Sequence, residues 1–213
     1  MVTIYIVRHG YSIGNEKEIL TGNLDCDLAE YGLKQAKLVS NYIVQNLNVD
    51  AFYSSDLCRA VNTIKPAAEA LGMPIYYEKD FREVNCGEWE GIPFEKLSGE
   101  YAQKYQAWYK QTDVVHPEGG ETWAQLQKRV LKRLGELAEE NDGKRILIST
   151  HGGVIKALRC FLSNIDLSKM YELDWVSNAS ISEITFDQGR YYVNYIGFDD
   201  YLGELKTELP KGV

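Results

Sequence analysis

Two runs rich in branched apolar residues lie far apart in the chain, and each ends directly in a polar loop. The first covers residues 2–7 and stops at Arg8 and His9, and the second covers residues 145–150 and stops at His151. Compact apolar runs of this kind are typical of strands that are buried on both faces of a parallel sheet. The pattern therefore predicts two buried strands, each of which presents a histidine at its carboxyl end.

Apolar residues spaced three and four apart predict two helices after the first strand. Residues 27–30 have the Asp-x-x-Glu pattern of a capping box, which predicts that the first helix starts there. The second helix is expected over residues 57–71, where Pro66 must kink it or break its hydrogen bonding. Short strands fit residues 51–54 and 75–77. The buried face of the first helix is expected to carry Leu33, Ala36, Val39, Ile43 and Leu47.

The second half of the chain predicts two more helices and a pair of strands. Apolar residues at helical spacing over residues 123–137 indicate a long amphipathic helix, which ends at the Asn-Asp-Gly turn of residues 141–143. A further helix is expected at about residues 154–162. Two strands of the antiparallel type are expected near residues 181–186 and 191–196.

Strands that alternate with helices indicate a three-layer α/β/α fold with a mainly parallel central sheet. Residues 88–118 are rich in tryptophan, tyrosine and polar residues and lack the alternation of a strand. We expect this segment to be a helical insertion that acts as a lid. We find no repeat, low-complexity tract or linker, so residues 1–213 are expected to form a single domain. Ligands of open sheets bind at the carboxyl ends of the strands, so both histidine loops should open into one cleft.

Composition and charge narrow the function classes. The chain has 213 residues and a formal net charge of -8, which argues against a broad surface for nucleic acid or anionic lipid, since both require clustered positive charge. We find no basic leader and no run approaching the roughly 18 apolar residues of a transmembrane helix. The cysteines form no CxxC pair, so free thiols in a reducing cytoplasm are expected. They are Cys26, Cys58, Cys86 and Cys160.

The first histidine loop has the chemistry of a phosphate site. Arg8 offers planar donors that grip two oxygens at once, and its charge does not titrate near neutral pH. His9 can act as a nucleophile if its other ring N–H is held by a backbone carbonyl. An isolated strand-end histidine more often satisfies a backbone group, so the assignment depends on further candidates. Ser12 and Asn15 follow as short polar donors.

Further candidates match this loop. Arg59 lies near the start of a predicted helix, where N–H groups and the helix dipole favour an anion, although a solvated surface arginine is the alternative. Glu83 could give a proton to a leaving oxygen, but alone it is more typical of a charged surface residue. His151 supplies a second imidazole, and Gly152 and Gly153 begin the next helix. Together these residues meet the demands of transferring a dianionic phosphoryl group.

The ordered set of motifs resembles the histidine phosphatase superfamily, also called the phosphoglycerate mutase-like family, over nearly the whole chain. This family works without a metal, which agrees with a sequence that has three histidines and no metal-ligand spacing such as HExxH. No cofactor is expected. The matching segments are Arg8-His9-Gly10-Tyr11-Ser12-Ile13-Gly14-Asn15, Ser54-Ser55-Asp56-Leu57-Cys58-Arg59-Ala60-Val61-Asn62-Thr63, Glu83 with Gly87-Glu88-Trp89-Glu90-Gly91, and Thr150-His151-Gly152-Gly153.

The resemblance implies a role for each candidate. His9 is the expected nucleophile, which becomes phosphorylated, and Glu83 is the expected proton donor. The phosphate pocket is expected to comprise Arg8, Arg59 and His151. The set of expected substrate-binding residues consists of Asn15, Ser12, Gly22 and Gly152.

One departure from the family pattern bears on the type of enzyme. True cofactor-dependent mutases of the family usually have an Arg-x-Tyr-Gly stretch after the donor glutamate and a longer insertion beyond it. Here residues 84–86 are Val, Asn and Cys, and residues 117–122 are similar to the phosphatase branch. We therefore expect a phosphomonoester hydrolase that acts on a small phosphorylated metabolite and releases inorganic phosphate. A phosphoglycerate mutase is the alternative, and a non-catalytic phosphate-binding protein is a more distant one.

Overall fold

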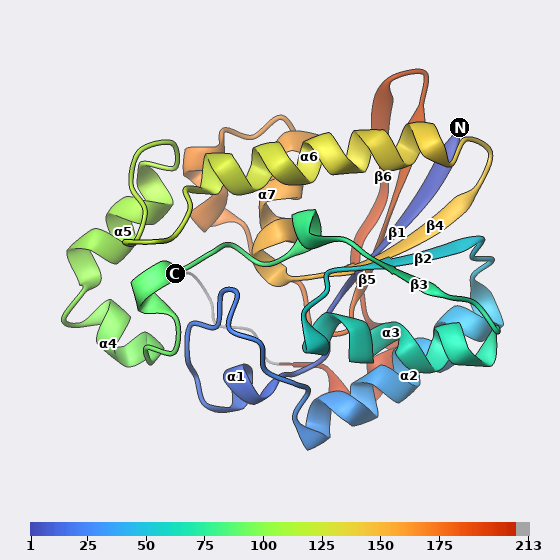
Figure 1. The fold of residues 1–213 in the computed structure, drawn as a ribbon, viewed down its shortest axis with the longest axis horizontal. Coiled ribbons are helices and arrows are strands. Elements are labelled where there is room, and N and C mark those ends of the chain that lie inside the picture. The colour runs from blue at the N-terminus through green and yellow to red at the C-terminus, as the bar shows by residue number, and fades with distance from the viewer. Residues whose placement is uncertain (208–213) are drawn as a thin grey trace.

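A six-stranded sheet forms the centre of the computed structural model, which describes residues 1–207 (Figure 1). The strands are β1 (Val2–Arg8), β2 (Ala51–Ser54), β3 (Ile75–Tyr77), β4 (Arg145–Thr150), β5 (Ile181–Asp187) and β6 (Arg190–Phe198). Their order across the sheet is β3-β2-β4-β1-β5-β6. The first four strands in this order run parallel to one another, whereas β5 runs antiparallel to both of its neighbours, β1 and β6. The mainly parallel sheet expected from the sequence is confirmed.

Two layers of helices cover the sheet. The α-helices are α1 (Ile13–Glu16), α2 (Glu30–Asn46), α3 (Cys58–Ala70), α4 (Phe94–Ser98), α5 (Ala102–Lys110), α6 (Trp123–Glu140) and α7 (Gly152–Leu162). Helices α2 and α3 lie on one face of the sheet and α6 and α7 on the other (Figure 1). Along β4, Leu147 joins the apolar core beneath α2 and α3, whereas Ile146 and Ile148 join the core beneath α6 and α7. The central strands are therefore buried on both faces, as their apolar runs predicted.

The register of the sheet brings the two histidine loops together. Strands β1 and β4 are parallel neighbours in which Arg8 pairs with Thr150. His9 therefore leaves the sheet beside His151, and the His9 N–H donates to the Thr150 carbonyl at 2.9 Å. Because β5 runs antiparallel to β1, its first residues lie at this same edge. The segment that precedes β5 thus reaches the histidine loops as well.

Helix α2 begins differently from its predicted capping box. Its N-cap is Ala29, which makes no side-chain hydrogen bond to the first turn. The carboxylate of Asp27 instead accepts from the Leu28 N–H and from the Asn62 side chain, at 2.7 Å each. Asp27 therefore ties the loop to α3, and the capping box expected at residues 27–30 is wrong. The carboxylate lies too early in the chain to serve a helix that starts at Glu30.

Two details of the predicted helical faces also differ. The three central residues of the expected face of α2 are buried, but Leu33 is 55% exposed and Leu47 is only half-buried. Leu33 lies at the edge of the buried face of the helix, so its side chain is close to solvent. Helix α3 continues through Pro66, so the expected break is limited to the one hydrogen bond that proline cannot donate. Pro66 is exposed, so its ring does not disturb the packing against the sheet.

Residues 88–118 form a helical excursion from the sheet, as expected, and contain α4 and α5. Its aromatic side chains pack against the amino end of α6. The ring centroids of Trp89 and Trp108 are 5.6 Å apart, and those of Trp108 and Trp123 are 4.8 Å apart. All three tryptophans are buried, so the excursion is anchored to α6 by an aromatic core. Its action as a lid, and the extent of the domain, stay predictions.

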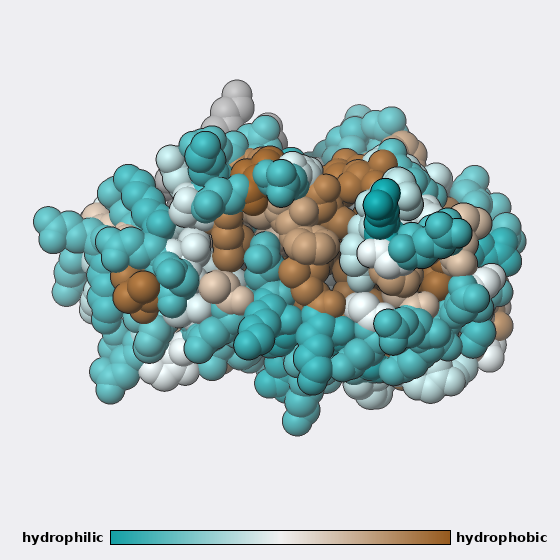
Figure 2. Space-filling model, turned by 90° about the horizontal axis from the view of Figure 1, so that it is seen from above, coloured by the Kyte–Doolittle hydropathy of each residue, from teal (hydrophilic) through white to brown (hydrophobic). Residues whose placement is uncertain are grey.

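The short 3₁₀ helices join the larger elements. They are η1 (Lys79–Phe81), η2 (Gly87–Trp89), η3 (Leu167–Glu172) and η4 (Asp200–Leu205). The last of them packs on α2, where the Tyr201 ring stacks on Tyr42 with centroids 4.6 Å apart. Figure 2 shows the side on which α6 lies, where polar side chains cover most of the surface and apolar ones gather near the centre. Over residues 1–207, no helix is long and apolar enough to span a bilayer.

Candidate active site

His9 lies just beyond β1, and both its ring and its backbone are held in place. Its Nδ1 atom is 2.7 Å from the Gly10 carbonyl, and because a carbonyl can only accept, Nδ1 carries the proton. The Nε2 atom of the neutral ring then keeps a free electron pair. The Asn178 side chain donates to the His9 carbonyl at 3.0 Å. The Thr63 hydroxyl accepts from the Gly10 N–H at 2.8 Å, so the loop presents Nε2 in one orientation.

The two histidines lie side by side in an uncharged state. The ring centroids of His9 and His151 are 5.2 Å apart, and both side chains are buried. Burial lowers the pKa of His9 well below its ordinary value, and the charges of Arg59 and Arg8 lower it further. The pKa of His151 is lowered in the same way, first by burial and then by Arg59. Each imidazole is therefore neutral at neutral pH, which is the form in which a ring nitrogen can attack phosphorus.

Arg8 and Arg59 are buried cations that use only part of their hydrogen-bonding capacity. Nη1 of Arg8 donates to the Val176 carbonyl. Arg59 donates to the carbonyls of Leu24 at 2.9 Å and Gly22 at 2.7 Å. The Nε atoms of both arginines are buried and have no partner within the described chain. Burial lowers the pKa of Arg8 to about 10 and also lowers that of Arg59, so both groups stay charged at neutral pH and can bind an anion.

His151 reaches the site from the end of β4. Its Nε2 atom lies 2.8 Å from the Ser55 hydroxyl, and its buried Nδ1 atom has no partner among residues 1–207. His151 is also the N-cap of α7, so the free N–H groups of the first helical turn begin beside it. A methyl group on Gly152 would come within 3.2 Å of the Arg8 Nε atom and 3.0 Å of the Trp175 ring. Gly152 thus lies at the contact between the helix start and a buried arginine.

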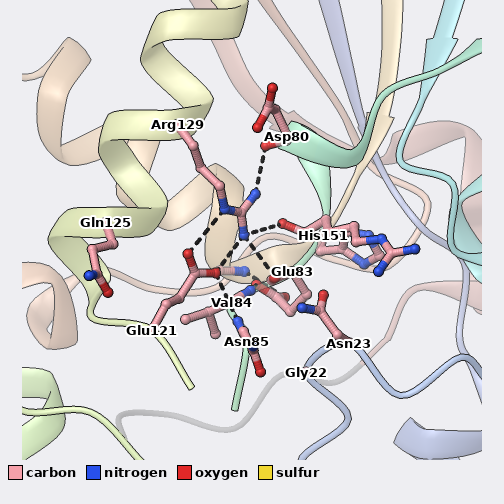
Figure 3. Close-up of polar contacts among 12 residues, drawn as sticks. Gly22, Asn23, Asp80, Glu83, Val84, Asn85, Glu121, Gln125, Arg129 and His151 are labelled. Atoms are coloured by element: carbon pink, nitrogen blue, oxygen red, sulfur yellow. Dashed lines mark hydrogen bonds and ion pairs between the residues drawn. The ribbon is translucent and has the colours of Figure 1, made fainter. Parts of the chain in front are cut away.

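Glu83 meets the same helix start from another loop (Figure 3). Its carboxylate accepts from the Gly153 N–H at 3.0 Å and from the Val84 N–H at 2.9 Å. A methyl group on Gly153 would lie 2.3 Å from a Glu83 carboxylate oxygen, so glycine leaves room for this contact. When it is ionised, the Glu83 carboxylate raises the pKa of Arg8 against the larger effect of burial. The five residues expected to be catalytic therefore lie in one cluster.

The residues expected to contact the substrate are held in different ways. Ser12 and Asn15 form a capping box at α1, in which the Asn15 Oδ1 atom accepts from the Ser12 N–H and hydroxyl at 3.0 Å each. Gly22 has a φ of +49°, and a methyl group there would lie 2.5 Å from a Glu90 carboxylate oxygen. The Gly22 carbonyl orients Arg59. Direct contact of these residues with the substrate stays a prediction.

Sequence reasoning missed the residues that support the site from the segment before β5. Trp175 packs near Arg8, whose guanidinium carbon is 5.8 Å from the ring centroid. Asn178 holds the carbonyl of His9, as described above. A signal for this segment was present, because an antiparallel strand beside parallel ones begins at their carboxyl edge. A polar run directly before such a strand belongs to the same edge of the sheet.

Two neutral imidazoles, two guanidinium groups and a carboxylate thus surround the first turn of α7. Such a set can bind a dianionic phosphoryl group and offer it both a nitrogen nucleophile and a carboxyl group for proton transfer. Over residues 1–207, no group of three or more His, Cys, Asp or Glu side chains is arranged to hold a metal ion. The fold and the site together define an α/β protein equipped for phosphoryl chemistry.

Comparison with known proteins identifies the family. Residues 4–199 match the histidine phosphatase superfamily (branch 1), and the chain belongs to this family. It is 30% identical to phosphoserine phosphatase 1 of Hydrogenobacter thermophilus over 213 residues, which is 100% of both chains. It is 33% identical to the metal-independent phosphoserine phosphatase of Arabidopsis thaliana, over 73% of this chain and 66% of that protein. The resemblance expected from the motifs is confirmed.

Two further similarities concern the fold and the range of the family. The solved structure of YhfR from Bacillus stearothermophilus is similar with a TM-score of 0.88 at 24% identity, covering 95% of this chain and 100% of that chain. A probable phosphoglycerate mutase of Yersinia pestis is 32% identical over 78% of this chain and 75% of that protein. The family of this chain therefore has relatives named as phosphatases and relatives named as mutases.

Proposed function

We propose that the protein is a metal-independent phosphomonoester hydrolase that works through a phosphohistidine. In the first step the Nε2 atom of His9 bonds to phosphorus, the bond from phosphorus to the ester oxygen breaks, and Glu83 gives a proton to that oxygen. In the second step water bonds to phosphorus, the bond to His9 breaks, and the Glu83 carboxylate takes a proton from the water. Arg8, Arg59 and His151 bind the three non-bridging oxygens in both steps.

The orientation and charge of His9 carry this proposal. Its Nδ1 proton is held by the Gly10 carbonyl, and burial next to two cations keeps the ring neutral. Buried polar atoms normally have hydrogen-bond partners, and the partnerless Nε atoms of Arg8 and Arg59 favour an anion as the missing partner. A neutral nucleophile between two cations suits a phosphoryl group, since its oxygens are attracted while its phosphorus is attacked.

The substrate class follows from the relatives. Two of the similar proteins are named phosphoserine phosphatases, one of them along the full length of this chain. We therefore propose small phosphorylated metabolites as substrates, with phosphoserine as the first to test.

Phosphoglycerate mutation is the second candidate, and the segment after Glu83 argues against it. A mutase must keep water from its phosphohistidine and hold the substrate carboxylate with additional cations. Residues 84–86 are Val, Asn and Cys, none of which is a cation. Among the lysines of residues 88–118, Lys104 is already paired with Glu88 at 3.0 Å. Water should therefore reach the intermediate more readily than a second substrate oxygen.

One experiment separates the two candidates. The purified protein is incubated with phosphoserine, sugar phosphates, nucleotides and 3-phosphoglycerate, the last with a catalytic amount of 2,3-bisphosphoglycerate. Free phosphate and 2-phosphoglycerate are measured together. Hydrolysis predicts phosphate release without isomer exchange. Rapid isomer formation with negligible phosphate would replace the hydrolase proposal with a mutase.

A further inference from the structure

Glu83 lies on a segment that, among the described residues, pairs with no strand of the sheet. One strand side chain reaches it, since the Thr150 hydroxyl of β4 donates to the Phe81 carbonyl at 2.8 Å. We call residues 80–86 the acid loop. Three successive N–H groups of this loop donate hydrogen bonds to side-chain carboxylates, and none of the three donates to a neighbouring strand. The Val84 N–H donates to Glu83 at 2.9 Å, the Asn85 N–H to Glu121 at 2.9 Å, and the Cys86 N–H to Glu90 at 3.2 Å. Of these acceptors, only Glu121 comes from a distant part of the chain.

Arg129, on helix α6, binds the acid loop from the side opposite to His151 (Figure 3). Its Nη1 atom donates to the Asp80 carbonyl at 2.6 Å. Its Nη2 atom donates to the carbonyls of Arg82 and Glu83, at 3.0 Å each. One guanidinium group therefore holds three backbone carbonyls, including that of the expected proton donor itself.

Glu121 completes this arrangement. Its carboxylate accepts from Arg129 Nη2 at 2.6 Å and Nε at 3.1 Å, while the same carboxylate accepts the Asn85 N–H. The Glu121 N–H also donates to the Asn85 carbonyl at 2.9 Å. The ion pair is largely buried, since the two side chains are 22% and 16% exposed. Glu121 thus links the acid loop to Arg129 by both its backbone and its side chain.

The Pro-Glu-Gly-Gly-Glu-Thr motif of residues 117–122 gains a role from these contacts. A methyl group on Gly120 would lie 2.7 Å from the Asn85 carbonyl oxygen, and one on Gly87 would lie 2.0 Å from the Glu118 carbonyl oxygen. Glycines at these positions let the motif approach the acid loop closely enough for Glu121 to reach it. The motif is therefore shaped to the acid loop as well as to the start of α6.

We propose that Arg129 and Glu121 are positioning residues that hold Glu83 at the distance and angle needed for proton transfer. This inference rests on the proposed function and assigns to the pair a role that acts through Glu83 alone. A general acid must lie within hydrogen-bond reach of the departing oxygen, and a misplacement of about 1 Å can cost about 10²-fold in rate. Among the described residues, no hydrogen bond of Arg129 or Glu121 reaches the two histidines or the two arginines of the phosphate pocket.

The chain supplies a matched control on the same helix. Arg133 lies one turn beyond Arg129 and is exposed to a similar extent, 17% against 22%. It makes ion pairs with Glu78 at 2.8 Å and Glu140 at 2.9 Å. Among the described residues, none of its hydrogen bonds reaches the acid loop. Arg133→Lys therefore weakens an ion-pair network of α6 without touching the support of Glu83.

The test compares an alkyl phosphate, whose leaving oxygen needs a proton, with a nitrophenyl phosphate, whose leaving group departs without one. Arg129→Lys keeps the charge but cannot span the carbonyls and Glu121, because an ammonium lacks the planar fork of a guanidinium. We expect kcat/KM, which does not include hydrolysis of the phosphohistidine, to fall about 10- to 100-fold on the alkyl phosphate and less than about 3-fold on the aryl phosphate. Arg133→Lys should change neither by more than about 2-fold.

Glu121→Gln is measured in parallel, because it keeps the side-chain shape and preserves the test should Arg129→Lys fold poorly. It should show the same selective loss to a smaller extent. Thermal unfolding of each variant checks that the comparison is made on folded protein. Equal losses on the two substrates, or the same selectivity in Arg133→Lys, would overturn the inference.

A double substitution separates this inference from the proposed function. With Glu83→Gln already present, Arg129→Lys should not change the alkyl-to-aryl ratio further, because the residue acts only through Glu83. A further change by the same factor would show that Arg129 acts independently of Glu83, which contradicts the inference alone. If the wild-type protein released no phosphate from any ester, or if Glu83→Gln showed no selectivity, the proposed function would itself be wrong.

Discussion

The histidine half and the acid half of the site are built in different ways. The histidine half lies at the carboxyl ends of β1 and β4. Hydrogen bonds between these parallel strands fix the position of the backbone as far as the pair Arg8 and Thr150. The acid half lies on the acid loop, in which Arg129 donates to three backbone carbonyls and Glu121 accepts the Asn85 N–H. Hydrogen bonds between strand backbones remain when one side chain is replaced, whereas hydrogen bonds made by a side chain are lost when that side chain is replaced. Substitutions remote from the reacting atoms should therefore harm the acid half more.

The largest effect is expected from His9→Ala, which removes the proposed nucleophile from the histidine half. Turnover should fall by at least about 10⁴-fold on alkyl and aryl phosphates alike, since both need the nitrogen. The melting temperature should change little, because among residues 1–207 the ring hydrogen-bonds only to the carbonyl of Gly10. Rapid quenching of the wild-type protein with labelled substrate should trap an acid-labile, base-stable phosphoryl-protein. Label on Ser, Cys or Asp would contradict this mechanism.

Glu83→Gln tests the acid half and should act selectively. General acid catalysis is typically worth about 10²- to 10⁴-fold, so hydrolysis of an alkyl phosphate should slow by about that factor. Hydrolysis of a nitrophenyl phosphate should slow much less, because its leaving group needs no proton. Values of kcat/KM on both substrates measure the contrast, because kcat/KM does not include the hydrolysis of the phosphohistidine, in which Glu83 also acts. Equal losses would assign Glu83 a role in binding or structure, and the two halves would no longer differ in function.

The histidine half also predicts how stability depends on pH. In the folded protein the pKa values of His9 and His151 are well below 6.5, because of burial and the nearby arginines. The unfolded chain takes up protons on these groups as the pH falls through about 6.5, and the folded protein does not. The free energy of unfolding should therefore fall below pH 6.5, by up to about 1.4 kcal/mol per pH unit for each histidine.

Urea unfolding between pH 7.5 and 5.5 in phosphate-free buffer measures this slope. His151→Gln and His9→Gln should each remove about half of it, because each removes one of the two groups whose protonation differs between the folded and unfolded states. A slope that both variants leave unchanged would mean that other groups cause the pH dependence.

Two adjacent glycines give the smallest expected effect and the sharpest comparison of the halves. Gly153→Ala places a methyl group 2.3 Å from a Glu83 oxygen, whereas Gly152→Ala places one 3.2 Å from the Arg8 Nε atom. Displacing the acid by a fraction of an ångström should cost roughly tenfold on alkyl phosphates and little on aryl phosphates. Gly152→Ala should instead weaken both reactions by similar factors. Both rates are compared for each variant, and identical selectivity in the two would show that the halves are not separable.

The sequence allowed the histidine half to be predicted because its signal is local. Branched apolar runs that stop at His9 and at His151 indicate strand ends, and parallel strands present their ends at one edge. Arg8 needed no further information, since it adjoins His9 in the chain. The resemblance to the family added Arg59 and Glu83, whose local patterns are also those of ordinary surface residues. The capping box predicted at residues 27–30 is wrong because the pattern does not fix where the helix begins, and α2 begins at Glu30.

What the sequence determined by itself was the alternation of strands and helices and the residue types at the strand ends, because burial imposes a period on apolar positions. What only the tertiary structure decided was the support of the acid half. Glu121 and Arg129 lie 38 and 46 residues after Glu83 in the printed numbering, and their contacts carry no periodic signal. A guanidinium on a helix meets three loop carbonyls only after the sheet, α6 and the acid loop have packed together.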